Sequence, residues 1–436
     1  MILEAIENQD PRHVALQDDT QSVCYGELKQ FIQSRIDALY GVSVLGVALD
    51  NSVDWVLWDL AALKAEIPIV PIPAFFTRKQ VDHLLQSVGV SHLACREGLQ
   101  KTIIQTKIIL PKGTAKVTFT SGTTGTPKGV CLSKSAMENV ASSLVKVLGD
   151  DFVDTHLSVL PLAVLLENVA GIYAGLLVGC TIKLTNLHRF GQNYENIRGV
   201  LQQTNASSVI VVPEILRALM TQVIANGPLP NLKFIAVGGA KIDPLLVLQA
   251  RMMGLPVYEG YGLSECASVV SLNFPGHDKP GSVGKILPHL KVQIVEGEIQ
   301  IQKPNFLGYI GEKPPQVFNT GDLGALDEHG FLLITGRKKN VLITSFARNI
   351  SPEWVESVLL AQFEIAQVLV YGEAQPHLSA LIVPSSPRAD IQVAIDTANQ
   401  SLPDYAQIKD FRIVRPFTVA EGTLTGTGRP RREKIS

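Results

Sequence analysis

Short apolar segments alternate with amphipathic helical patterns along most of this chain, and this alternation limits the folds open to it. Apolar runs typical of buried strands, and the helical patterns between them, occupy residues 42–50, 53–66, 67–73, 78–89, 207–212, 232–239, 243–254 and 256–262. Strands separated by helices of this length predict largely parallel sheets covered on both faces.

The pattern changes after residue 280. Turns at Glu296-Gly297 and His329-Gly330 predict antiparallel hairpins. Ser351 and Pro352 then fit the N-cap and first position of a helix, and strand-like runs follow it. We therefore expect an α/β fold. Residues 1–336 would form a large N-terminal domain of stacked, mostly parallel sheets covered by helices, with a small antiparallel barrel-like part. Residues 337–340 would form a hinge, and residues 341–436 a small, mobile α+β domain.

Length and charge narrow the class of protein. A chain of 436 residues exceeds one small core, so two or more domains are expected. The formal net charge of −2 gives no general reason to expect nucleic-acid binding. The cysteines are scattered without a CxxC pair, which predicts reduced thiols in a cytoplasmic protein. They are Cys24, Cys95, Cys131, Cys180 and Cys266.

No segment predicts a membrane span. The first residues are acidic and polar, so we expect no signal peptide. The most apolar window, residues 160–180, is interrupted by Glu167 and Asn168, and a buried helix is the preferred interpretation. The positive mean hydropathy leaves peripheral membrane contact open.

The stretch TFTSGTTGTPKGV, residues 118–130, combines three glycines with several hydroxyl side chains and one lysine. We expect a tight loop between a strand at 116–120 and a helix within 131–148, with a capping box at Ser135 and Glu138. Glycines let backbone amides converge on an anion, and Lys128 adds a positive charge. The loop therefore suits phosphate oxygens, although a hydroxyl-rich surface loop is the alternative. Pro127 and Gly129 exclude the Walker pattern.

This loop resembles the phosphate loop of the adenylate-forming family, which includes acyl- and aryl-CoA synthetases, luciferase and peptide-synthetase adenylation domains. Further matches follow in the family's order and extend over nearly the whole chain. They are Gly238-Gly239-Ala240, the element YEGYGLSE at 258–265, Asn319-Thr320-Gly321-Asp322, the hinge-like Gly336–Asn340, and SPEWVE at 351–356.

The resemblance implies two half-reactions, in which a carboxylate attacks MgATP to give acyl-AMP and pyrophosphate, and a thiol then takes the acyl group. It assigns the β- and γ-phosphates to Thr120, Ser121, Gly122, Thr123, Thr124, Gly125 and Lys128. It assigns the adenine and α-phosphate to Gly238, Gly239, Ala240, Glu259, Gly260, Tyr261, Gly262 and Ser264. Glu265, with Thr120, would hold Mg²⁺, and Asp322, supported by Arg337, would accept from the ribose hydroxyls.

Other site chemistries fit poorly. Ser264 lacks the closing glycine of a nucleophile elbow, which argues against a serine hydrolase. The histidines form no HExxH and no close cluster, which argues against a zinc site. Without the resemblance, Asp322 would be interpreted as a turn residue, and Ser264 and Glu265 as a cap or surface pair.

The chain departs from the family pattern at three places. Arg429 stands where the family has its C-terminal catalytic lysine, and Lys434 is the alternative. The glycine-rich turn after the hinge is replaced by residues 345–348, SFAR, without the positive-φ freedom of glycine. Val164 replaces a histidine that is common in long-chain enzymes, so we expect an apolar pocket wall there.

We expect an ATP-dependent, AMP-forming acyl-CoA synthetase with a medium- or long-chain fatty acid as substrate and ATP, Mg²⁺ and coenzyme A as cofactors. One alternative is a fatty acyl-AMP ligase that loads the phosphopantetheine of an acyl-carrier protein. Another is a catalytically weakened regulator that binds nucleotide or acyl chains. Activation of an amino acid is disfavoured, because no acidic residue is clearly placed to meet an α-amine.

Overall fold

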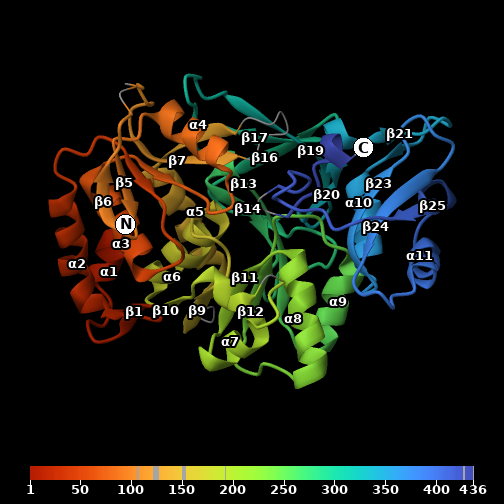
Figure 1. The fold of residues 1–436 in the computed structure, drawn as a ribbon, viewed down its shortest axis with the longest axis horizontal. Helices are drawn as coiled ribbons and strands as arrows, with labels where there is room; N and C mark the ends of the chain where they lie inside the picture. The colour runs from red at the N-terminus through yellow and green to blue at the C-terminus, as the bar shows by residue number, and fades with distance from the viewer. Residues whose placement is uncertain are drawn as a thin grey trace.

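The computed structural model describes residues 1–104, 106, 108–120, 127–149, 154–191, 193–425 and 428–435. Figure 1 shows the N-terminal helices on one side of the molecule and the C-terminal strands β23 to β25 on the other. The helices of the N-terminal part are α1 (Ile2–Glu7), α2 (Tyr25–Ala38), α3 (Val53–Ala65), α4 (Arg78–Val88), α5 (Lys134–Leu148), α6 (Ala174–Val178), α7 (Ile197–Gln203), α8 (Pro213–Asn226) and α9 (Pro244–Met252).

A nine-stranded sheet forms one large layer, and its central strands, from β13 to β1, are parallel. In order they are β15 (Lys285–Ile286), β14 (Ser268–Leu272), β13 (Val257–Leu263), β12 (Phe234–Val237), β11 (Ser208–Val211), β9 (Thr155–Ser158), β10 (Thr181–Leu184), β1 (Val14–Gln17) and β2 (Ser22–Cys24). The pairs at both edges are antiparallel. The predicted α/β class with mostly parallel sheets is confirmed.

A seven-stranded sheet forms the second layer, with α3 and α4 between its parallel strands in the chain. Its strands are β18 (Phe306–Tyr309), β8 (Lys128–Ser133), β7 (Thr114–Thr120), β4 (Ile69–Pro71), β3 (Leu45–Val47), β5 (His92–Cys95) and β6 (Gly98–Lys101). Helix α3 is buried on nearly all sides, as expected for a helix that is apolar around its whole circumference.

The glycine-rich loop joins two antiparallel strands, so the predicted strand-to-helix connection is wrong. Thr120 at the end of β7 pairs with Lys128 at the start of β8. Helix α5 begins only after β8, and Ser133 caps it by accepting from the backbone N–H of Ala136 at 3.1 Å. The predicted capping box is also wrong, because the Glu138 carboxylate instead accepts from the backbone N–H of Ile2 at 3.1 Å.

The apolar window at 160–180 is a buried helix, as predicted, but it begins as a π-helix, η2 (Leu166–Tyr173), that continues into α6. Its first polar residue, Glu167, accepts from the Leu160 backbone N–H at 3.1 Å and lies 2.8 Å from His156 Nε2. The next, Asn168, donates to Asp59 Oδ2 at 2.9 Å. Internal partners therefore satisfy the polar residues that interrupt the apolar run.

A four-stranded antiparallel sheet follows, made of β16 (Lys291–Val295), β17 (Glu298–Gln302), β19 (Val317–Leu326) and β20 (Leu332–Arg337). Val295 pairs with Glu298, so the turn at Glu296-Gly297 lies where it was predicted. Leu326 pairs with Leu332, which confirms the second hairpin.

The C-terminal elements have a hydrophobic cluster of their own. They are β21 (Leu342–Ile343), β22 (Asn349–Ile350), α10 (Pro352–Leu360), β23 (Ile365–Tyr371), β24 (Leu378–Pro384), α11 (Ile391–Gln400), β25 (Ile408–Ile413) and α12 (Arg432–Ile435). The hinge predicted at 337–340 overlaps the short helix η5 (Lys338–Asn340). The domain boundary there and the mobility of the last domain stay predictions. In the turn between β21 and β22, Ala347 has φ of +55°, so a positive φ persists there without glycine.

Candidate active site

A cavity of about 460 Å³ opens where β11, β12 and β13 end. Val212, which follows β11, and Gly238 and Gly239, which follow β12, form one part of its wall. Leu166 and Ala170 of the π-helix form another part. Ligands of open α/β sheets bind at the carboxyl ends of the strands, so this is the expected place for a site.

Several residues predicted to bind the nucleotide line this cavity. They are Gly238, Gly239, Gly260, Tyr261, Gly262 and Ser264, and the predicted catalytic residue Arg429 also lines it. Ala240, which directly follows Gly239 in the chain, is exposed. Val164 also lines the cavity, so the wall has an apolar side chain at this position, as the sequence predicted.

Asp322 is held in a fixed orientation at the edge of this region. Its side chain is buried, and its Oδ1 accepts from Arg337 Nε at 2.8 Å, because β19 and β20 pair these two residues. Its Oδ2 accepts from the Tyr261 hydroxyl at 2.7 Å. Burial, reinforced by the neighbouring Asp322, raises the pKa of Tyr261, so this phenol is a proton donor. The contact links the YEGYGLSE element to the predicted ribose acceptor.

Glu265 and Lys128 lie on either side of Tyr309, a residue that the sequence analysis missed. The Tyr309 hydroxyl donates to Glu265 Oε1 at 2.7 Å. The Lys128 ammonium lies 5.0 Å from the centre of the Tyr309 ring and 3.7 Å from a Glu312 carboxylate oxygen. Nothing in the sequence marks Tyr309, because its contacts depend on the pairing of β18 with β8.

Five residues of the predicted phosphate loop, Ser121, Gly122, Thr123, Thr124 and Gly125, lie outside the described residues. Thr120 and Lys128 flank them at the paired ends of β7 and β8. Among the residues that the structure describes, no three His, Cys, Asp or Glu side chains gather to hold a metal ion. Glu265 therefore fits Mg²⁺ only as one hard oxygen ligand beside nucleotide oxygens and water, which is the usual way that proteins hold this ion.

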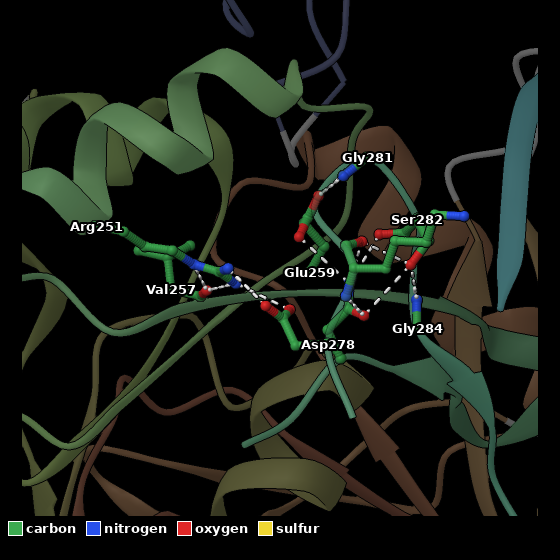
Figure 2. Close-up of polar contacts among 9 residues, drawn as sticks. Arg251, Val257, Glu259, Asp278, Gly281, Ser282 and Gly284 are labelled. Atoms are coloured by element: carbon green, nitrogen blue, oxygen red, sulfur yellow. Dashed lines mark hydrogen bonds and ion pairs between the residues drawn. The ribbon is translucent and has the colours of Figure 1, made fainter. Parts of the chain in front are cut away.

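Figure 2 shows the carboxylate of Glu259 bound to the neighbouring loop at Gly281. Glu259 is not among the described residues that line the cavity. Its Oε1 accepts from the Gly281 backbone N–H at 2.7 Å, and its Oε2 from Asn273 Nδ2 at 3.3 Å. Burial raises the pKa of Glu259 to about 7. In the same network, Arg251 of α9 forms two hydrogen bonds to Asp278, at 2.6 and 2.9 Å. Glu259 thus connects β13 to the segment that follows β14.

Arg429 lies in the cavity, whereas Lys434 does not. The Arg429 guanidinium donates to the carbonyl oxygen of Gly239. Lys434 lies on α12 and is exposed. The tail between them is anchored by Arg432, which donates to Val370 O at 2.7 Å and to the buried carboxylate of Glu356. Of the two residues considered for the catalytic cation, Arg429 is the one that lines the cavity, and its role stays a prediction.

Two residues of α8 were also missed. Glu214, in its first turn, lines the cavity. One turn later, Arg217 donates to the carbonyl oxygens of Gln362 and Ile365, at 3.1 and 2.5 Å. These contacts join segments far apart in the sequence, so no local pattern could reveal them.

The chain matches the family model described as AMP-binding enzyme over residues 3–113 and 104–320. It is 33% identical to "Long-chain-fatty-acid–CoA ligase FadD15" of Mycobacterium bovis over 242 residues, which is 47% of this chain and 40% of that protein. It is 30% identical to "2-succinylbenzoate–CoA ligase" of Bacillus subtilis over 319 residues, which is 68% of this chain and 63% of that protein. The matched part is thus less than two thirds of each of these relatives.

Solved structures share the fold. An anthranilate CoA ligase, AuaEII, in complex with anthranoyl-AMP has a TM-score of 0.85 at 17% identity, over 100% of this chain and 96% of the other. An o-succinylbenzoate CoA synthetase of Bacillus subtilis, in complex with ATP and magnesium ion, has a TM-score of 0.78 at 22% identity, over 96% and 97%. Within the described residues, no helix is both long and apolar enough to cross a bilayer.

Proposed function

The chain belongs to the AMP-binding enzyme family, and from this premise we propose that it is an AMP-forming acyl-CoA ligase. In the first half-reaction a carboxylate would attack the α-phosphorus of ATP, giving acyl-AMP and pyrophosphate. In the second, the thiol of coenzyme A would take the acyl group and release AMP. The arrangement of Asp322 carries this proposal, because both of its oxygens are held by donors beside a cavity lined with the predicted nucleotide residues.

Each half of the nucleotide would meet different residues. Asp322 is an acceptor suited to the ribose hydroxyls, and Gly238, Gly239 and Tyr261 offer backbone and ring surfaces for adenine. Lys128, with the loop that precedes it, would neutralise charge on the phosphates as pyrophosphate leaves. Mg²⁺, held in part by Glu265, would supply further positive charge to these oxygens.

Arg429 would act where the two substrates meet. Its position in the cavity, next to Gly239, suits contact with both the reacting carboxylate and the α-phosphate. Joining two anions requires such a cation, because negative charge accumulates on the phosphate oxygens in the transition state. Arginine can offer two parallel N–H donors to this group.

The cavity wall supports an apolar acid with one carboxylate. Leu144, Leu148, Leu160, Val164 and Ile215 are among the residues that form it. Among the described residues that line the cavity, the only charged ones are Glu214 and Arg429. If Arg429 meets the reacting carboxylate, a second carboxylate finds no cation, and Glu214 would repel it. A medium- or long-chain fatty acid therefore fits better than 2-succinylbenzoate.

Pyrophosphate release with a panel of acids tests this proposal. Straight-chain acids from hexanoate to palmitate are expected to support release, and 2-succinylbenzoate is expected to support little. Adding either coenzyme A or an acyl-carrier protein then identifies the acceptor. No release with any acid would contradict the proposal and favour a nucleotide- or acyl-binding regulator.

A further inference from the structure

Tyr309 contacts both side chains that we assign to the pyrophosphate end of ATP. Its hydroxyl donates to Glu265 Oε1 at 2.7 Å, and its ring lies beneath the Lys128 ammonium at 5.0 Å. Both contacts lie outside the cavity described above. One aromatic side chain thus connects the strand that carries Lys128 with the element that carries Glu265.

The backbone around Tyr309 allows little movement of the ring. Strand β18 pairs with β8, Tyr309 lies opposite Val130, and the Ile310 N–H donates to Gly129 O at 3.0 Å. Gly308 makes the approach possible, since its φ is +107° and an added Cβ would lie 2.4 Å from the carbonyl oxygen of Glu312. The ring also packs edge-to-face on Phe306, with centroids 5.5 Å apart. The hydroxyl is therefore delivered by a rigid support.

The hydrogen bond gives Glu265 a fixed orientation. The phenol is the donor in this contact, because a carboxylate oxygen can only accept. With Oε1 taken by the phenol, Oε2 has no hydrogen-bond partner among the described residues. Carboxylates that bind metals are commonly oriented by a donor on their other oxygen, and loss of that donor weakens metal binding.

The ring gives Lys128 a position without a strong competing partner. The Lys128–Glu312 pair is more than half exposed, and such pairs contribute little. A cation over an aromatic face is attracted by the ring but keeps its N–H donors free for an anion. Lys128 can therefore turn from the ring to a phosphate oxygen at small cost.

We propose that Tyr309 is the positioning residue of the metal–pyrophosphate end of the site. Its hydroxyl aims Glu265 at Mg²⁺, and its ring holds Lys128 close to the phosphates. This inference rests on the proposed function, because it assigns Glu265 and Lys128 to MgATP. It does not depend on which acid or thiol is the substrate.

Two substitutions separate the two contacts. Tyr309→Phe keeps the ring and removes the hydroxyl, and Tyr309→Leu removes both. Glu312→Gln is the matched control, because it removes the exposed partner of Lys128 and leaves Glu265 untouched. Thermal unfolding of each variant checks that the fold is retained.

The readout is binding of Mn²⁺ in the presence of ATP, followed by electron paramagnetic resonance without any acid, so turnover is not needed. Tyr309→Phe is expected to weaken Mn²⁺ binding about 10- to 100-fold, the usual effect of losing a partner of a metal ligand. Tyr309→Leu should in addition weaken the affinity for pyrophosphate. Glu312→Gln should match the unmodified protein in both.

The outcomes distinguish this inference from the proposed function. A folded Tyr309→Phe protein with unchanged Mn²⁺ affinity would overturn the role of Tyr309 alone, even if acid-dependent pyrophosphate release is normal. Weakened Mn²⁺ binding would support it even if the acid panel gave no release. An unmodified protein that binds no Mn²⁺ with ATP would overturn both.

Discussion

At the scale of single residues, the candidate site combines charges that are held in place with charges that remain free. Asp322 has partners on both oxygens, and Glu265 has one on Oε1. Arg429 donates to the backbone carbonyl of Gly239 and, within the part of the chain that the structure describes, forms no ion pair with a carboxylate. This distribution suits a site in which the acceptors are preset and the cations are left for anionic substrates.

Arg429→Ala is expected to reduce acid-dependent pyrophosphate release by about 100-fold or more, because it removes a positive group that meets charge forming in the transition state. Lys434→Ala should change the rate little, since Lys434 is exposed on α12. Initial rates with the best acid of the panel give the comparison. Equal effects of the two substitutions would contradict the assignment of Arg429.

Glu259 makes stability depend on pH. In the folded chain the Glu259 carboxyl keeps its proton until about pH 7, because burial raises its pKa from the ordinary value of about 4.5. Between these values the folded state binds more protons than the unfolded state, so the free energy of unfolding falls as pH rises. Glu259→Gln should remove this loss, which amounts to at most about 3 kcal/mol.

The measurement is urea unfolding of both proteins at pH 5 and pH 8. The free energy of unfolding of the Glu259→Gln protein, minus that of the unmodified protein, should be larger at pH 8 than at pH 5. Glu356, whose pKa is also raised to about 7, contributes a similar slope to both proteins and cancels in the comparison. An identical pH dependence in the two proteins would count against the buried, protonated state of Glu259.

At the scale of elements, the π-helix at the cavity wall rests on a buried polar network. Lys116 of β7 is fully buried, and its ammonium lies 2.8 Å from Asp59 Oδ1 of α3. Asn168 and Tyr173, both from the π-helix, donate to Asp59 Oδ2 at 2.9 Å. The network thus ties the sheet, helix α3 and the cavity wall to one another.

Lys116→Met is expected to lower the free energy of unfolding by about 3–5 kcal/mol, since it leaves the buried Asp59 without its counter-charge. The double variant Lys116→Met with Asp59→Leu should recover much of that loss, because two apolar side chains replace the pair. Chemical denaturation of the three proteins gives the values. A single variant as stable as the unmodified protein would refute the coupling.

The sequence predicted elements well where local pattern determines them and poorly where tertiary pairing does. The helical pattern at 53–66 and the turn at Glu296-Gly297 are local signals, and both elements were predicted. Strand β8 was missed because its residues were assigned to the helix that follows, and its second partner, β18, is distant in the sequence. For the same reason the ordered motifs located Gly239, Tyr261 and Asp322, whereas Tyr309 and Arg217 became visible only in three dimensions.

At the scale of the whole molecule, Arg217 joins the large N-terminal part to the segment after α10. It donates to the carbonyl oxygens of Gln362, which follows α10, and of Ile365, the first residue of β23. The C-terminal tail also places Arg429 in the cavity. Arg217 therefore stabilises the arrangement of the parts that we assign to acyl-AMP formation.

Arg217→Ala is expected to slow acyl-AMP formation about 10- to 100-fold, from the loss of charged hydrogen bonds contributing roughly 1.5–3 kcal/mol. Transfer from preformed acyl-AMP to coenzyme A should be spared.

Lys339→Pro, which stiffens the predicted hinge, should do the opposite, sparing acyl-AMP formation and slowing transfer. Rapid-quench assays of each half-reaction make the comparison. Equal losses in both steps would contradict a small domain that rotates at the predicted hinge between the two half-reactions.

The central claim is that one ATP molecule extends from Asp322 at its ribose to Lys128 at its terminal phosphates. A crystal structure determined with MgATP bound measures this most directly. We expect the ribose hydroxyls within hydrogen-bond distance of the Asp322 carboxylate and the β- and γ-phosphates against Lys128. A triphosphate bound away from Lys128, or a ribose bound away from Asp322, would contradict the account.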